Sequence, residues 1–116
     1  MNMIRTALPP RAAILLSALM LATTVTQAQV SREQRDQFAA RTVDRCIQSQ
    51  RADPTQAAQT DAAIREFCAC YARRVADAMP DDVLNTSLSA ATPQQLEAAQ
   101  SVMRQSAQAC RGQTQP

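Results

Sequence analysis

Four cysteines are the residues of this chain with the most distinctive chemistry. Cys68 and Cys70 are separated by one residue within the stretch Ile-Arg-Glu-Phe-Cys-Ala-Cys-Tyr at 64–71, and Cys46 and Cys110 lie on the segments before and after it. Four cysteines in a small exported chain are typical of a disulfide framework. We therefore predict that all four form structural disulfides.

Two other cysteine chemistries are weaker matches. Redox cysteines work best at an exposed helix N-terminus, where the helix dipole lowers the thiol pKa, whereas Cys68 and Cys70 lie in the middle of a predicted helix. A zinc site made of cysteines usually contains two close pairs, and this chain has one close pair and two distant single cysteines. We keep a thiol–disulfide redox protein as the alternative interpretation, and we predict no metal and no cofactor.

The first 28 residues predict a secretory signal peptide. Arg5 and Arg11 give a positive start, residues 12–22 are almost entirely apolar, and Thr26-Gln27-Ala28 is a small-residue pattern typical of a cleavage site. The apolar run is shorter than the roughly 20 residues that span a bilayer. We expect cleavage after Ala28, no membrane span in the mature chain, and a periplasmic or secreted location.

The mature chain is formally neutral. Two of the 12 basic residues lie in the signal peptide, which leaves ten arginines against ten acidic residues. Nucleic acid and anionic membranes favour a basic excess, so neither is an expected partner. The chain contains no histidine and a single glycine, which excludes a conventional Ser-His-Asp triad and a glycine-rich phosphate loop. We predict no catalytic residue.

Caps and hydrophobic periodicity predict where the first two long helices lie. Ser31 and Gln34 form a capping box at the start of the first helix, which should end near Arg51. The second helix should begin at Thr60, after a loop or turn over 52–59, because an earlier start would place the cysteines of the two helices too far apart to bond. Pro80 should end it.

The rest of the chain predicts one short helix and one long one. Residues 81–84 fit a short helical turn and residues 85–92 a connector. Thr92-Pro93-Gln94-Gln95 combines a cap, a proline at the first helical position and a glutamine three residues after the cap, so a long helix should start there. We expect this helix to end at Gly112 and residues 113–116 to form a frayed tail.

The predicted fold class is all-α. Residues 29–112 should form one small disulfide-stapled bundle of three long helices with one short helix. Large apolar residues are few, and the abundant alanine and glutamine form helices readily but bury little apolar area. A core this small generally needs covalent links, so the disulfides should determine whether the domain folds.

Helix geometry limits the disulfide pairing. Residues two apart on a helix point about 200° away from each other, so Cys68 and Cys70 cannot bond to one another without breaking the helix. Two pairings remain, which are Cys46–Cys68 with Cys70–Cys110, or Cys46–Cys70 with Cys68–Cys110. In both, the central helix is bonded once to the first helix and once to the last.

We favour the pairing in which Cys68 bonds to Cys110. Cys68 lies on the apolar stripe of the central helix, and the last helix would need that stripe to bury Leu96 and Met103. The other pairing stays open as the alternative.

The sequence favours a non-enzymatic function. We expect a small exported protein that binds or assists another component of the cell envelope through a helix face or groove. The expected partner is a protein, and the sequence specifies neither its identity nor the oligomeric state. The alternative is a redox protein that uses the Cys-x-Cys pair.

Overall fold

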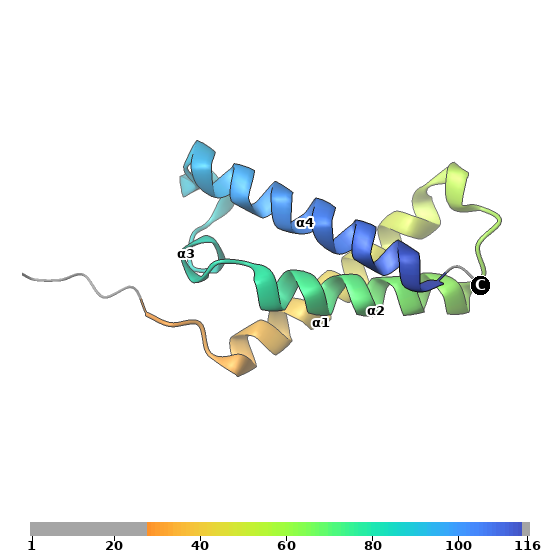
Figure 1. Ribbon diagram of the computed structural model, residues 1–116, viewed down its shortest axis with the longest axis horizontal. Helices are drawn as coiled ribbons and strands as arrows, with labels where there is room; N and C mark the ends of the chain where they lie inside the picture. Colours follow the sequence, from red (N-terminus) through yellow and green to blue (C-terminus); the bar gives the residue numbers. More distant parts are fainter. Residues whose placement is uncertain (1–27, 115–116) are drawn as a thin grey trace, which may run out of the picture.

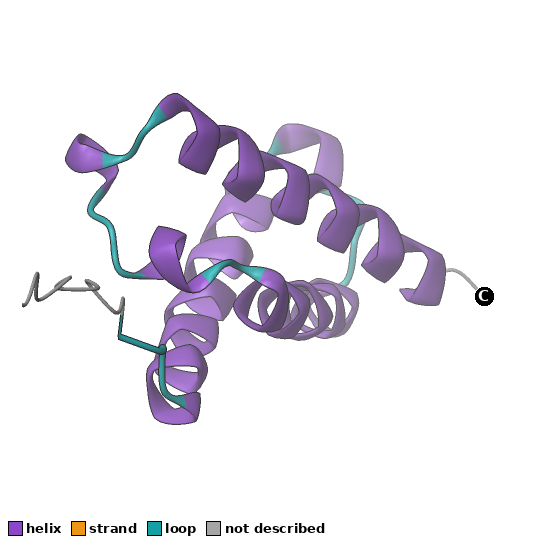
Figure 2. Cartoon of the chain, turned by 60° about the vertical axis from the view of Figure 1, so that its left-hand side comes forward, coloured by secondary structure: helices purple, strands orange, loops and turns teal. Residues whose placement is uncertain are grey.

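Helices and loops account for all of residues 28–114, the part of the chain that the computed structural model describes (Figure 2). The long helices are α1 (Arg32–Ala52), α2 (Asp61–Ala78) and α4 (Pro93–Thr114), and α3 (Asp81–Leu84) is short. Two single 3₁₀ turns, η1 (Pro54–Gln56) and η2 (Leu88–Ala90), lie in the connections. The all-α prediction, with three long helices and one short helix, is confirmed. Apart from Ala28, the predicted signal peptide lies outside the described residues.

The first two long helices begin at the predicted caps. The Ser31 hydroxyl accepts a hydrogen bond from the Gln34 backbone N–H at 3.1 Å, and the Gln34 side-chain oxygen accepts one from the Ser31 N–H at 2.8 Å. At α2, the Thr60 hydroxyl accepts from the Ala63 N–H at 3.1 Å. These bonds satisfy N–H groups that have no partner inside the helix.

The loop between α1 and α2 is held by Asp53. Its carboxylate accepts hydrogen bonds from the hydroxyl and the backbone N–H of Thr55, at 2.7 and 2.9 Å. These two bonds favour the ionised form and lower the pKa of Asp53 below its usual value. Asp53 therefore caps η1 and not α2, and the later start of α2 at Thr60 is confirmed.

The start of α4 is also tied to α3. Thr92 and Gln95 form a second capping box, with bonds of 3.0 and 3.2 Å. The Gln95 amide also donates to the Asp82 carboxylate and to the Thr86 hydroxyl, each at 3.2 Å. This glutamine thus fixes both the first turn of α4 and its position beside α3.

The predicted end of α4 is wrong. A glycine ends a helix by adopting a positive φ angle. Gly112 has no positive φ, and α4 continues through it to Thr114. Residues 113 and 114 are therefore helical, and residues 115–116 lie outside the described residues.

The central element is α2, which has α1 on one flank and α4 on another (Figure 1). In Figure 1, α1 crosses behind α2 and α4 runs along its upper side. Both α1 and α4 pack against α2, but within the described residues no Cα atom of α1 lies within 8 Å of one of α4. The three long helices therefore do not close around a common axis.

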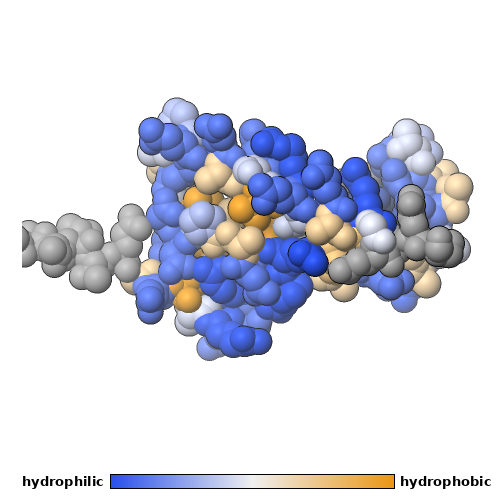
Figure 3. Space-filling model, viewed as in Figure 1, coloured by the Kyte–Doolittle hydropathy of each residue, from blue (hydrophilic) through white to orange (hydrophobic). Residues whose placement is uncertain are grey.

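The core is small and is contributed mainly by α2. Its buried members include two alanines, Ala72 and Ala76, that are fully buried and let neighbouring helices approach closely. Hydrophobic side chains also reach the surface between α2 and α4, within a mostly hydrophilic face (Figure 3). The buried residues are Ala39, Ile64, Cys68, Ala72, Val75, Ala76, Met79, Ser106 and Cys110.

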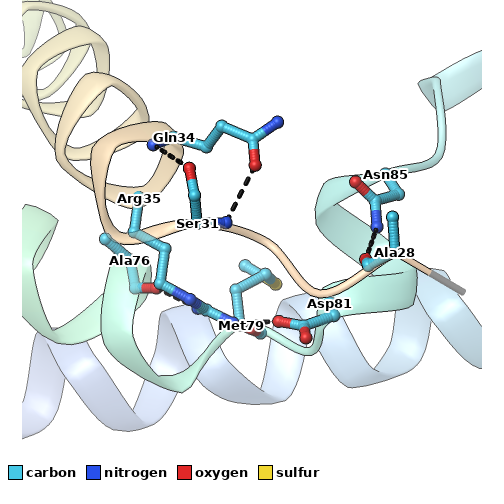
Figure 4. A network of polar contacts seen from close by, with 8 residues as sticks. All are labelled: Ala28, Ser31, Gln34, Arg35, Ala76, Met79, Asp81 and Asn85. Atoms are coloured by element: carbon cyan, nitrogen blue, oxygen red, sulfur yellow. Dashed lines mark hydrogen bonds and ion pairs between the residues drawn. The ribbon is translucent and has the colours of Figure 1, made fainter.

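A single arginine of α1 donates hydrogen bonds to backbone carbonyl groups at the C-terminal end of α2 (Figure 4). The Arg35 guanidinium donates to the carbonyl oxygens of Ala76 and Met79, the latter at 3.0 Å, and pairs with the Asp81 carboxylate at the start of α3. The last carbonyls of a helix have no partner within it, and a positive charge there also opposes the helix dipole. Arg35 therefore joins α1, α2 and α3 at one point.

We expect Arg35→Ala to lower the free energy of unfolding by about 1–3 kcal/mol, because it leaves part-buried carbonyls without a donor. Denaturant unfolding followed by circular dichroism, with the disulfides intact, measures this loss.

Arg73→Ala is the matched control. Arg73 forms exposed ion pairs with Asp36 and Asp77, and the hydrogen bond that its guanidinium donates to the Asp36 carboxylate is the main cause of its raised pKa. The loss of these exposed ion pairs should lower the free energy of unfolding clearly less than the loss of Arg35 does, because surface ion pairs contribute little. Equal losses for the two variants would contradict this interpretation of Arg35.

Candidate functional site

All four cysteines are in disulfides. Cys46 bonds to Cys68 with a Cα–Cα distance of 5.6 Å, and Cys70 bonds to Cys110 with a Cα–Cα distance of 5.8 Å. The first bond links α1 to α2 and the second links α4 to α2. The predicted bonding of the central helix to both neighbours is confirmed.

The favoured pairing of Cys68 with Cys110 is wrong. It assumed that α4 lies on the apolar stripe of α2 in order to bury Leu96 and Met103, yet these side chains remain 40% and 39% exposed. The last helix lies instead on the Cys70 flank, where Val102 and Ser106 approach the surface around Arg74, Asp77 and Ala78. This leaves Cys68, which is fully buried, to bond to α1.

An open groove follows from this arrangement. It runs along α2 between α1 and α4 and has a volume of about 450 Å³, within the range of ligand-binding clefts. Its lining comes from all three long helices, namely Phe38, Thr42, Arg45, Cys46, Ser49 and Gln50 of α1, Phe67, Tyr71 and Val75 of α2 with its C-cap residue Met79, and Met103, Ala107 and Arg111 of α4.

The groove floor is apolar and partly open to solvent. Phe67 and Tyr71 stack on one another with ring centroids 6.0 Å apart, and both are half-buried. Met103 is 39% exposed on the opposite wall. Apolar side chains of this size, left uncovered in a concave site, are typical of a surface that another molecule covers.

Partial burial changes the acidity of the groove's phenol. Removal of the Tyr71 side chain from water disfavours the charged phenolate and raises its pKa above 10.0. The direction of this shift agrees with the half-buried position of the Tyr71 ring on the groove floor.

Charge is unevenly distributed along the groove. Phe38, Met79 and Met103 lie toward one end, and Arg45 and Arg111 lie beside the disulfides toward the other. No acidic side chain of the described residues lines the groove. The site therefore combines an apolar half with a cationic half.

The sequence pointed to the cysteines but not to this groove. Phe67 and Tyr71 lie in the same stretch as Cys68 and Cys70, and Arg45 and Arg111 carry no signal beyond their positions next to Cys46 and Cys110. Among residues 28–114 there is no group of three or more potential metal-ligating side chains. No helix in that range is both long and apolar enough to cross a bilayer.

The chain matches no protein-family model, no curated protein and no solved structure. The groove and the two disulfides are therefore the features of this chain from which a function can be inferred.

Cys46→Ala tests the pairing. The variant should contain one free thiol, at Cys68, which alkylation in denaturant without reductant will label. Trypsin leaves Cys68 and Cys70 in one peptide, residues 66–73, so fragmentation of that peptide must locate the label. Cys110→Ala is the matched variant and should place the label on Cys70. The reverse pattern would contradict the observed pairing.

Because the two bonds have sequence separations of 22 and 40 residues, each variant should also lose about 3–4 kcal/mol of stability in the chain-entropy model.

Tyr71 is the only tyrosine and there is no tryptophan, so phenolate absorbance reports this residue alone. We expect its titration midpoint in the folded protein to lie above the midpoint in denaturant. Because the pKa is higher in the folded state, the stability from neutral Tyr71 is present below about pH 10 and falls as the pH rises further. Tyr71→Phe should remove both the signal and this part of the pH dependence. Equal midpoints with and without denaturant would show that the groove floor is fully hydrated.

Proposed function

We propose that this protein is a small exported protein, periplasmic or secreted, that binds or assists another protein of the cell envelope without being an enzyme. The signal-peptide pattern at 1–28 supports export. The two disulfides agree with an oxidising compartment, because such bonds persist there and are rare in the cytosol.

The observation that carries the proposal is the open groove. Both α1 and α4 are covalently fixed to α2, yet within the described residues no Cα atom of one lies within 8 Å of a Cα atom of the other. The partly exposed side chains between them, including Phe67, Tyr71 and Met103, form a preformed apolar surface on a rigid frame. Preformed surfaces bind at a lower entropic cost than surfaces that must first be ordered.

The cysteines support a binding role over a redox role. Cys68 and Cys110, one from each disulfide, are fully buried, and the bonds hold the helices that shape the groove. A redox carrier would have to open one of them in each cycle and would release α1 or α4. Catalytic turnover of a thiol–disulfide substrate by the purified protein would overturn the proposal in favour of the redox alternative.

Site-specific photocrosslinking in intact cells tests the binding role. A photoreactive amino acid at Phe38 or Met103, on opposite walls of the groove, should crosslink to the same envelope protein. Asp44 and Arg104 are the matched control positions, because they lie on the same two helices, are exposed and do not line the groove. Adducts that are equally abundant from groove and control positions would contradict the groove as the binding surface.

A further inference from the structure

The groove has the shape of a missing helix position. On its floor, Phe67, Tyr71 and Val75 of α2 and the C-cap residue Met79 follow one another at intervals of four residues. Val75 and Met79 are buried, so Phe67 and Tyr71, which are half-buried, are the part of this floor that another helix could cover. In a four-helix bundle, a fourth helix occupies the position between two helices that pack on a common neighbour.

The charged residues that line the groove indicate which charge a helix bound there should carry. Arg45 precedes Cys46 and Arg111 follows Cys110, so the two disulfides hold both arginines near the same level of α2. Arg45 forms no ion pair within the described residues. Arg111 also lines an adjoining pocket together with Asp53. Arg45 is therefore the cation at this end of the groove that is complementary to an acidic group of a partner.

We propose that the groove binds an amphipathic helix of the partner protein, with its apolar face on Phe67, Tyr71 and Met103 and an acidic residue at the end that meets Arg45. This inference rests on the proposed function and specifies the chemical class of the partner segment. Apolar anchors at i, i+4 and i+7 of that helix would contact these partly exposed side chains, as in other helix-in-groove complexes.

A helix fits better than an extended peptide. Extended peptides commonly bind by adding a strand to an exposed sheet edge, and residues 28–114 contain no strand. A helix satisfies its own backbone hydrogen bonds, so it needs only side-chain contacts from the apolar walls that this groove provides.

Three synthetic helical peptides test the proposal. They share leucines at i, i+4, i+7 and i+11, contain no tyrosine or tryptophan, and carry two Glu, two Gln or two Lys at one end. Tyr71 is the only intrinsic fluorophore other than phenylalanine, so its emission reports binding in the groove. We expect the Glu peptide to bind about threefold or more tighter than the Gln peptide, the Lys peptide to bind most weakly, and these differences to shrink in high salt.

Arg45→Gln should abolish most of the preference for the Glu peptide. Arg41→Gln is the matched control, because Arg41 lies one turn away on α1, is exposed and does not line the groove. It makes the same change in net charge and should leave the preference unaltered. An equal effect of the two variants would mean that the preference comes from net charge and would overturn the role of Arg45.

The remaining outcomes separate this inference from the proposed function. If all three peptides change Tyr71 emission with equal affinity, the acidic requirement is wrong and the groove remains a binding site. If no peptide binds while photocrosslinking from Phe38 and Met103 succeeds, the partner segment is not a helix. Binding of dodecanoate but of no peptide would identify an acyl-chain site. Sedimentation of the protein as a dimer, together with failure of every peptide to bind, would indicate that a second copy covers the groove. Either result would overturn the inference.

Discussion

Two covalent bonds that leave one helix in different directions determine the shape of this protein. Cys68 and Cys70 point about 200° apart around α2, and each bonds to a different neighbour. The helices that carry Cys46 and Cys110 must therefore lie on different flanks of α2. They cannot close on one another as they would in a compact three-helix bundle, and the groove between them is a direct consequence of the Cys-x-Cys spacing.

The small core makes this constraint decisive. Most of the buried residues are small, and Val75 is the largest of the fully buried side chains. Hydrophobic burial of this extent gives little margin over the conformational entropy that folding removes. A disulfide worth about 3–4 kcal/mol is a large part of the 5–15 kcal/mol that stabilises a typical domain. The covalent links thus replace part of the core that α1 and α4 would otherwise have formed together.

Most helix boundaries could be predicted from local features such as N-caps, because these features depend only on short stretches of sequence. Ser31, Thr60 and Thr92 cap the three long helices as their side-chain chemistry predicts. The pairing could not be read in the same way, because it depends on which flank of α2 receives α4. That choice rested on the assumption that Leu96 is buried, and the structure leaves it exposed. The groove needs side chains from three helices, so no single stretch of sequence could reveal it.

Overall neutrality does not prevent a local concentration of charge. Within residues 28–114, four of the ten acidic side chains form ion pairs away from the groove: Asp36, Asp61, Asp77 and Asp81. Arg45 forms no ion pair within the described residues and lies beside a disulfide, where the groove lining carries no carboxylate. A formally neutral domain can therefore present a cationic group at one end of an apolar groove. Net neutrality disfavours binding to nucleic acid and anionic membranes, but it does not disfavour binding to an acidic protein segment. A short acidic helix needs only one or two opposite charges at a defined place, and the disulfides hold those charges there.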